Sequence, residues 1–268
     1  MEIQVNGTRQ FVPDGARLWD VRARFFPGAD VIILNGFQTG DNLPVCEKDA
    51  VTLIKKGEYP DEAALSHMLA ARLGPGVYKK FKGASVGVAG LGGVGSAVAM
   101  FLARSSVGRL VLADFDVVEP SNLNRQHYFL RHLGMAKADA IRGEILQANP
   151  YVSVEAAQIK LTEKNSPGFF QNCQVVCEAF DDAAQKAMLT GALLRANPSI
   201  KVVATSGMAG LGSANAIKSR RAFSNLYVCG DETAEAGCNM GLFAPRVSVC
   251  AGHAANAVLR ILLGLEDV

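Results

Sequence analysis

Gly90-Leu91-Gly92-Gly93-Val94-Gly95 follows the apolar run Ser85–Ala89 and precedes a helical pattern at residues 96–105. A strand, a G-x-G-x-x-G loop and a helix in this order are typical of nucleotide-binding parallel sheets. The glycines permit a tight turn and let backbone N–H groups approach a phosphate at the positive end of the helix. Residues 86–103 contain no charge, but each glycine would destabilise a membrane-spanning helix by about 1 kcal/mol, so no span is expected.

Beyond residue 82, apolar runs and helical patterns alternate. We expect strands at residues 109–113, 152–156, 175–180 and 202–205, and helices at residues 136–147, 183–196 and 247–263. The last helix is almost wholly apolar and is either buried or part of a subunit contact. The alternation predicts an α/β fold, a Rossmann-like, doubly wound and mostly parallel sheet with helices on both faces.

The first sixty residues have the pattern of a separate small domain. Asn6-Gly7 lies between the short segments at residues 1–5 and 8–12 and is a strong hairpin signal. A helical pattern at residues 16–26 follows a possible cap, Asp14, and residues 31–34 and 51–54 supply two more strands. This is the order of a β-grasp, or ubiquitin-like, domain. We therefore expect a β-grasp domain at residues 1–58, a linking helix at residues 59–82 and a nucleotide-binding domain at residues 83–268.

Composition excludes several classes of protein. The chain is 49% hydrophobic and 19% charged, which is enough apolar material for a large core and excludes a disordered chain. A formal net charge of +2 without a long basic run predicts neither a nucleic acid nor a membrane as partner. Six cysteines in 268 residues and a start without a signal-peptide pattern predict a reduced, cytoplasmic protein.

Asp114 closes the strand after the glycine loop, 24 residues beyond Gly90, where dinucleotide sites place an acid on ribose. An NAD- or FAD-binding oxidoreductase is therefore one interpretation. Arg125 and Lys137 favour a triphosphate instead, because its roughly four negative charges need fixed cations. Lys137 falls in the first turn of a predicted helix, where a cation opposes the helix dipole unless an anion is near. A solvated Lys137 and a surface ion pair at Arg125 are the alternatives.

Asp181 and Asp182 follow the strand expected at residues 175–180. They fall at the carboxyl edge of the sheet, where ligands of open α/β folds bind. Asp182 is the better candidate for the N-cap of the next helix, and Asp181 is the better candidate for a Mg²⁺ ligand beside the phosphates.

Several short motifs together resemble those of the ThiF/MoeB-type activating enzymes, the bacterial relatives of ubiquitin-activating enzyme. These motifs are Gly90-Leu91-Gly92-Gly93-Val94-Gly95-Ser96, Asp114-Phe115-Asp116, Ser121-Asn122-Leu123-Asn124-Arg125-Gln126, Lys137, Asn149-Pro150 and Asp181. The resemblance extends from about Phe81 to the C-terminus, and the S-N-L-x-R-Q block is rare outside this group. It implies ATP-dependent adenylylation of the C-terminal glycine carboxylate of a ubiquitin-like sulfur carrier, with release of pyrophosphate.

The resemblance also implies a role for each matching residue. Asp114 would hold the ribose, Asn122 and Arg125 the phosphates, Lys137 the charge between the α- and β-phosphates, and Asp181 the Mg²⁺ ion. The implied nucleotide-binding set comprises Gly90, Gly92, Gly93, Gly95, Ser96, Asp114, Asp116, Asn122, Arg125 and Lys137. Cys238 falls roughly where some relatives carry a cysteine that forms a covalent intermediate, and a packed, unreactive cysteine is the alternative.

The N-terminal segment resembles the thiamine sulfur carrier ThiS, but it runs on through Lys55-Lys56-Gly57-Glu58-Tyr59-Pro60. Without a free Gly-Gly carboxylate at this point it cannot be activated. We therefore expect a degenerate carrier domain, and as substrate a separate ThiS-type carrier of thiamine (thiazole) biosynthesis. Family members are homodimers, so the resemblance implies one here.

Two departures from the family pattern qualify these expectations. Many relatives bind zinc through two C-x-x-C pairs, but this chain has none, so we predict no zinc. An arginine that relatives place upstream of the glycine loop has only a weak match, Arg72. A non-catalytic ATP-binding or partner-docking relative is therefore an alternative to the enzyme.

Overall fold

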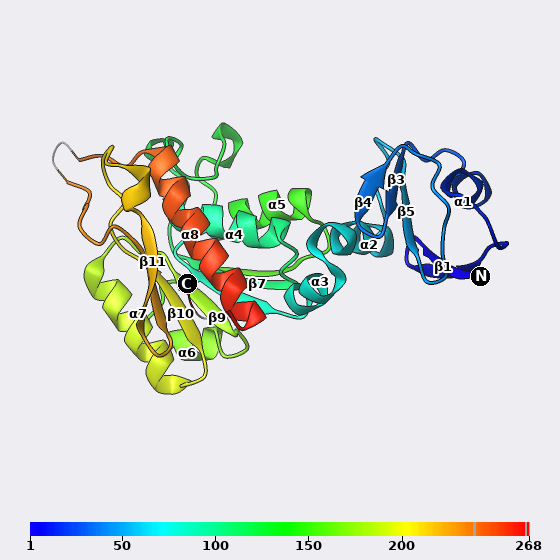
Figure 1. The fold of residues 1–268 in the computed structure, drawn as a ribbon. Helices are drawn as coiled ribbons and strands as arrows, with labels where there is room; N and C mark the ends of the chain where they lie inside the picture. Colours follow the sequence, from blue (N-terminus) through cyan, green and yellow to red (C-terminus); the bar gives the residue numbers. More distant parts are fainter. Residues whose placement is uncertain (238–239, 266, 268) are drawn as a thin grey trace. The chain divides into compact units, whose positions relative to one another are not determined.

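The computed structural model describes residues 1–237, 240–265 and 267. The chain divides into two compact units, Met1–Lys79 and Lys80–Val268 (Figure 1). Each unit has its own hydrophobic core. No helix in the part of the chain that the structure describes has the length and apolar character needed to cross a membrane.

The first unit contains a five-stranded sheet with α1 (Leu18–Phe25) packed on it. The strand order is β2-β1-β5-β3-β4, and β1 runs parallel to β5. The strands are β1 (Glu2–Val5), β2 (Thr8–Phe11), β3 (Val31–Leu34), β4 (Phe37–Thr39) and β5 (Ala50–Ile54). Asn6 and Gly7 form the predicted hairpin turn with φ of 46° and 76°, the left-handed values that this turn requires. The β-grasp prediction is confirmed.

Two local expectations for this unit are wrong. Asp14 does not cap α1, because its carboxylate accepts a hydrogen bond from the N-terminal ammonium; Asp20 instead accepts one from the backbone N–H of Arg17, the N-cap residue. The segment expected as one linking helix contains two, α2 (Glu62–Leu73) and α3 (Pro75–Lys82). Gly74, with φ of 89°, ends the first helix, and Pro75 begins the second, as these residue types favour.

The second unit contains a seven-stranded sheet in the order β11-β12-β10-β9-β6-β7-β8. Only the edge pair β11/β12 is antiparallel. The strands are β6 (Ser85–Ala89), β7 (Arg109–Asp114), β8 (Ser153–Gln158), β9 (Val175–Glu178), β10 (Lys201–Thr205), β11 (Lys218–Phe223) and β12 (Leu226–Gly230). From β6 the chain builds outward through β7 and β8, then returns to build the other half from β9. The boundary between β6 and β9 is therefore the switch point, where open α/β sheets bind ligands.

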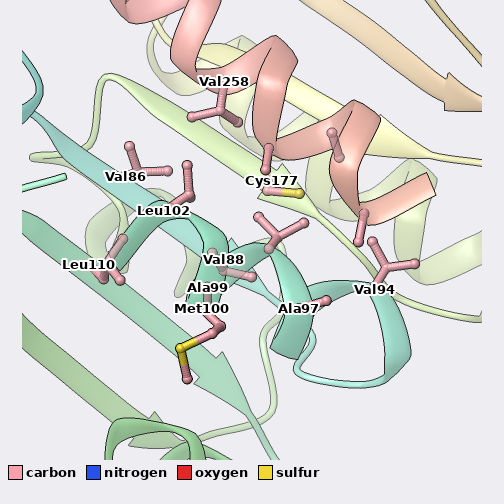
Figure 2. Close-up of a cluster of buried hydrophobic side chains, with 14 of the residues drawn as sticks. Val86, Val88, Val94, Ala97, Ala99, Met100, Leu102, Leu110, Cys177 and Val258 are labelled. Atoms are coloured by element: carbon pink, nitrogen blue, oxygen red, sulfur yellow. The ribbon is translucent and has the colours of Figure 1, made fainter. Parts of the chain in front are cut away.

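Helices cover both faces of this sheet, as expected for the α/β class. Val86 and Val88 of β6 pack against α4 (Gly93–Arg104) and α8 (Ala244–Leu263), and α5 (Lys137–Ala148) belongs to the same cluster (Figure 2). Ala89 packs on the opposite face, with α6 (Ser166–Phe169) and α7 (Ala183–Ala196). Residues all along α8 are buried, including Val258, so α8 is a core helix of this unit.

Candidate functional site

The glycine loop joins β6 to α4 at the switch point. Gly90 has φ of 83°, and a Cβ there would lie 2.9 Å from the carbonyl oxygen of Ala179. A Cβ on Gly95 would lie 1.8 Å from the carbonyl oxygen of Gly90. Glycine is therefore required at both positions: it allows the loop to turn tightly and to touch the turn that follows β9.

Buried polar groups hold this loop in one conformation. Asp114 accepts a hydrogen bond from the Leu91 N–H at 2.6 Å, and the Tyr128 hydroxyl donates to the Leu91 carbonyl at 2.8 Å. Ser96 Oγ donates to the Gly92 carbonyl at 2.6 Å. Burial raises the pKa of Asp114, while hydrogen bonds from the N–H groups of Asp116 and Leu91 act in the opposite direction. The loop is thus preorganised, with its helix terminus available to an anion.

Lys137 is the first residue of α5 and is buried. Its Nζ lies 2.9 Å from Asp116 Oδ2, and its N–H donates to the Asp116 carbonyl at 3.0 Å. The Asp116 side chain is 47% exposed. The sequence predicted an anion near this cation. Asp116 supplies a carboxylate that contacts Lys137 and is also open to solvent.

Arg125 lies beside the start of α4. Its Cγ is 3.5 Å from the position that a Cβ on Gly93 would occupy, and Nη1 donates to the Ser121 carbonyl and to Asn124 Oδ1 at 3.1 and 2.8 Å. Asn122 is buried, and its Oδ1 accepts a hydrogen bond from the Glu119 N–H at 3.1 Å. Asn122 therefore also shapes the turn that presents Arg125.

The two acids after β9 have different environments. Asp182 caps α7, since its Oδ1 accepts from the Gln185 N–H at 2.8 Å, as predicted. Asp181 is exposed and makes no hydrogen bond or ion pair within the described residues. Mg²⁺ is commonly held by one or two carboxylates together with substrate phosphates and water. A free Asp181, two residues after the Ala179 carbonyl that approaches Gly90, fits that ion.

The remaining predicted residues are less informative. Cys238 lies outside the described residues, so its role stays a prediction. Cys177, Cys229 and Cys250 are buried, and burial raises the pKa of Cys229 to about 11 and of Cys250 to about 12, which leaves them protonated core thiols. Across residues 1–237, 240–265 and 267, no three His, Cys, Asp or Glu side chains are grouped to hold a metal ion. Arg72 donates to Gln38 at 3.4 Å within the first unit.

Sequence reasoning missed several residues that build this edge of the sheet. Tyr128 follows the S-N-L-x-R-Q block and joins the glycine loop to α5, because its hydroxyl also lies 3.4 Å from the Lys137 carbonyl. Glu178, which is fully buried, forms an ion pair with the partly exposed Lys186, and these two residues precede and follow Asp181 in the sequence. Lys186 is a cation in the first turn of α7, where it opposes the helix dipole as Lys137 does in α5.

Comparisons with known proteins agree with this geometry. The ThiF family model matches residues 65–268, and the ThiS-like ubiquitin model matches residues 1–57. "Probable adenylyltransferase/sulfurtransferase MoeZ" of Mycobacterium tuberculosis is 31% identical over 131 residues, 48% of this chain and 33% of MoeZ. The "tRNA threonylcarbamoyladenosine dehydratase" of Bacillus subtilis is 40% identical over 110 residues, 40% of this chain and 43% of that protein.

Solved structures share the fold. E. coli tRNA N6-threonylcarbamoyladenosine dehydratase, TcdA, in complex with ATP, matches with a TM-score of 0.66 and 24% identity over 73% of this chain and 92% of that chain. The curated relatives are matched over less than half of their own length. The family model, in contrast, matches well over half of the present chain, including the whole edge described above. The chain belongs to the ThiF family and carries a ThiS-like ubiquitin domain at its N-terminus.

Proposed function

We propose that this protein uses ATP to adenylylate the C-terminal glycine carboxylate of a separate ThiS-type sulfur carrier in thiamine (thiazole) biosynthesis. The carrier's carboxylate oxygen forms a bond to the α-phosphorus of ATP. The bond from that phosphorus to the bridging oxygen of the β-phosphate breaks, and pyrophosphate leaves. The products are an acyl-adenylate and pyrophosphate.

One observation carries the proposal: two cations flank a preorganised glycine loop at the switch point. Arg125 lies against the start of α4, and Lys137 begins α5 at the same carboxyl edge. Transfer at phosphorus needs positioning and neutralised charge rather than a protein nucleophile. Asp114 is assigned to the ribose, Asn122 and Arg125 to the phosphates and Lys137 to the charge between the α- and β-phosphates. When bound, Mg²⁺ would neutralise phosphate charge, and Asp181 would hold it.

The partner and setting are part of the same proposal. The ThiS-like domain in the chain itself, matched at residues 1–57, favours a ThiS-type partner over other ubiquitin-like proteins. We propose that the reaction takes place in the cytoplasm and that the protein forms a homodimer. We also propose that the protein works without zinc, because the chain contains no C-x-x-C pair.

Pyrophosphate exchange tests this function. The full chain is incubated with ATP, Mg²⁺, labelled pyrophosphate and candidate ThiS-type carriers, and label in ATP is measured. Carrier-dependent exchange is expected. When the carrier is incubated with ATP and Mg²⁺ but without added pyrophosphate, its mass is expected to increase by one adenylate. ATP binding without exchange for any carrier would instead favour the non-catalytic docking protein, and binding of NADH in preference to ATP would favour the oxidoreductase.

A second candidate follows from similarity to the tRNA threonylcarbamoyladenosine dehydratase of Bacillus subtilis. Under that alternative the substrate is a modified nucleoside in tRNA rather than a protein carboxylate. The near-neutral net charge of +2 favours the protein substrate. Incubation with modified tRNA and ATP, followed by nucleoside mass spectrometry, separates the two, since only the dehydratase removes water from the nucleoside.

A further inference from the structure

Glu178 and Lys186 form an ion pair beneath the turn that follows β9. Glu178 is the last residue of β9, and its side chain is fully buried. Lys186 Nζ lies 3.1 Å from Glu178 Oε2 and 3.3 Å from Oε1, and it also donates to the Thr205 carbonyl at 2.8 Å. The pair therefore joins the end of β9, the first turn of α7 and the end of β10.

This arrangement is unfavourable on general grounds. The Glu178 carboxylate is fully buried and loses its hydration, whereas the Lys186 side chain stays 23% exposed. The cost of burying a carboxylate often cancels what its ion pair contributes to stability. Lys186 also opposes the dipole of α7, since it lies in the first turn. Burial raises the pKa of Glu178, and the charge of Lys186 acts in the opposite direction. Stability alone does not account for this pair, and its neighbours indicate a second role.

The pair fixes the backbone on one side of Asp181, and a helix cap fixes the other. Glu178 Oε1 accepts a hydrogen bond from the Phe180 N–H at 2.7 Å. The Asp182 carboxylate is held by the Gln185 N–H. Asp181 lies between these two anchored residues, and its own side chain is left without a partner in the described part of the chain.

The same turn touches the glycine loop. The Ala179 N–H donates to the Ala89 carbonyl at 2.9 Å, and the Ala179 carbonyl oxygen lies 2.9 Å from the position that a Cβ on Gly90 would occupy. A change in the turn therefore alters the position of Asp181 relative to bound phosphates. Outer partners of this kind orient a metal ligand without touching the metal.

We infer that Glu178 and Lys186 are positioning residues for the Asp181 carboxylate, and that their ion pair sets how strongly the site takes Mg²⁺ together with ATP. The inference rests on the proposed ATP-binding function. It assigns neither residue a contact with the nucleotide or the metal.

The test is ATP binding by the full chain, measured by calorimetry over a series of Mg²⁺ concentrations. In Lys186→Met, the Mg²⁺ concentration that gives half of the maximal gain in ATP affinity is expected to rise by about tenfold or more. This is the usual effect of losing a residue that orients a metal ligand. Lys186→Arg keeps the charge and is expected to restore most of the difference. Binding of ATP without Mg²⁺ is expected to stay within about twofold of the parent, because it does not need Asp181.

Asp181→Asn is the reference variant and is expected to shift the Mg²⁺ dependence at least as far. The double variant Glu178→Gln/Lys186→Met removes both charges, so it leaves no uncompensated buried charge and is expected to fold. It should still bind Mg²⁺ with ATP more weakly than the parent. An unchanged Mg²⁺ dependence in the folded double variant, or in Asp181→Asn, overturns the inference.

Hydrogen exchange without nucleotide separates this inference from the proposed function. The amides of Phe180 and Asp181 are expected to exchange faster in Lys186→Met than in the parent, while the amides of β6 keep their rates. Equal exchange at Phe180 overturns the positioning role whether or not ATP binds. A parent protein that binds no ATP at any Mg²⁺ concentration overturns the proposed function, and the Mg²⁺ part of the inference with it.

Discussion

Two ion pairs at the carboxyl edge of the large sheet, Asp116–Lys137 and Asp231–Arg246, differ in how completely their carboxylates are enclosed. The Asp116 side chain is 47% exposed although Lys137 is buried. In the second pair the Asp231 and Arg246 side chains are only 9% and 7% exposed. An ion pair whose anion faces solvent leaves its cation able to meet an incoming phosphate, whereas an enclosed pair does not.

Further hydrogen bonds show what the enclosed pair does instead. Arg246, near the start of α8, also donates to the Ala209 carbonyl. Asp231 accepts hydrogen bonds from the N–H groups of Thr233 and Ala234 at 2.8 Å each. The Asp231–Arg246 pair therefore ties the loop after β10 and the loop after β12 to α8. The comparison predicts a structural role for the enclosed pair and a catalytic role for Lys137.

The largest expected effect is on stability. Arg246→Met leaves the Asp231 charge buried without its cation and should lower the free energy of unfolding by about 3–5 kcal/mol. Urea denaturation measures it. The matched control, Lys137→Met, should lose about 1 kcal/mol or less, because water solvates the exposed Asp116 carboxylate. Equal losses in the two variants would break the comparison.

The next largest effect is on activity, and here the change at Lys137 is expected to matter more than the change at Arg246. Lys137→Met should reduce carrier-dependent pyrophosphate exchange by about 10²–10³-fold, the usual result of removing a charge-stabilising group from a transition state. Exchange at saturating ATP measures it, and Lys137→Arg should retain more activity because it keeps the charge. A Lys137→Met variant with the parent's rate would remove Lys137 from the site.

A smaller effect is expected on the stability of the protein at acidic pH. Burial acts to raise the pKa of Asp231, but hydrogen bonds from Ala234, Thr233 and Arg246 outweigh it and lower the pKa from 3.8 to about 2. A lowered carboxylate pKa contributes stability that is present above the unfolded-state pKa and is lost as the pH falls through the folded value.

Asp231→Asn should therefore flatten the decline in stability between about pH 4 and pH 2. Unfolding free energies over that range measure the effect. Asp116→Asn, at the half-exposed carboxylate of the other pair, is the matched control variant. A parent and an Asp231→Asn variant with the same acid slope would show that Asp231 is not the group that titrates.

The features that the sequence predicted depend on neighbours along the chain. β6 and α7 begin and end at the expected residues, and Asp182 caps α7 as expected. The G-x-G-x-x-G loop and the first-turn position of Lys137 also follow from spacing alone. Hydrophobic period, caps and glycine positions are local signals, so one sequence is enough to read them.

What the sequence did not predict depends on partners brought together by packing. Nothing in the spacing of Asp231 and Arg246 marks them as a pair, and the contact of Ala179 with Gly90 joins different strands. β11 was missed because Lys218, Arg220 and Arg221 make it polar, which a strand at the edge of a sheet tolerates. The end of α2 at Gly74 was missed because the apolar residues of α2 are spaced as in a helix, and that spacing does not show where the helix ends.

The smallest expected effect is that of metal removal. Many of the relatives implied by the resemblance bind zinc through two C-x-x-C pairs, but this chain contains no such pair, and Cys229 and Cys250 are buried in the core. Chelator should leave the melting temperature unchanged, and elemental analysis of protein purified without chelator should show only trace zinc. Near-stoichiometric zinc would mean that a metal, rather than Asp231–Arg246, is the main tie at this edge.

The position at which a nucleoside triphosphate binds is the central claim about this site. A crystal structure of the full chain with ATP and Mg²⁺ tests this directly. We expect the phosphates at the start of α4, in contact with the Arg125 guanidinium and with the Lys137 ammonium that Asp116 now holds. Phosphates bound elsewhere, with both side chains in their present hydrogen bonds, would contradict the account.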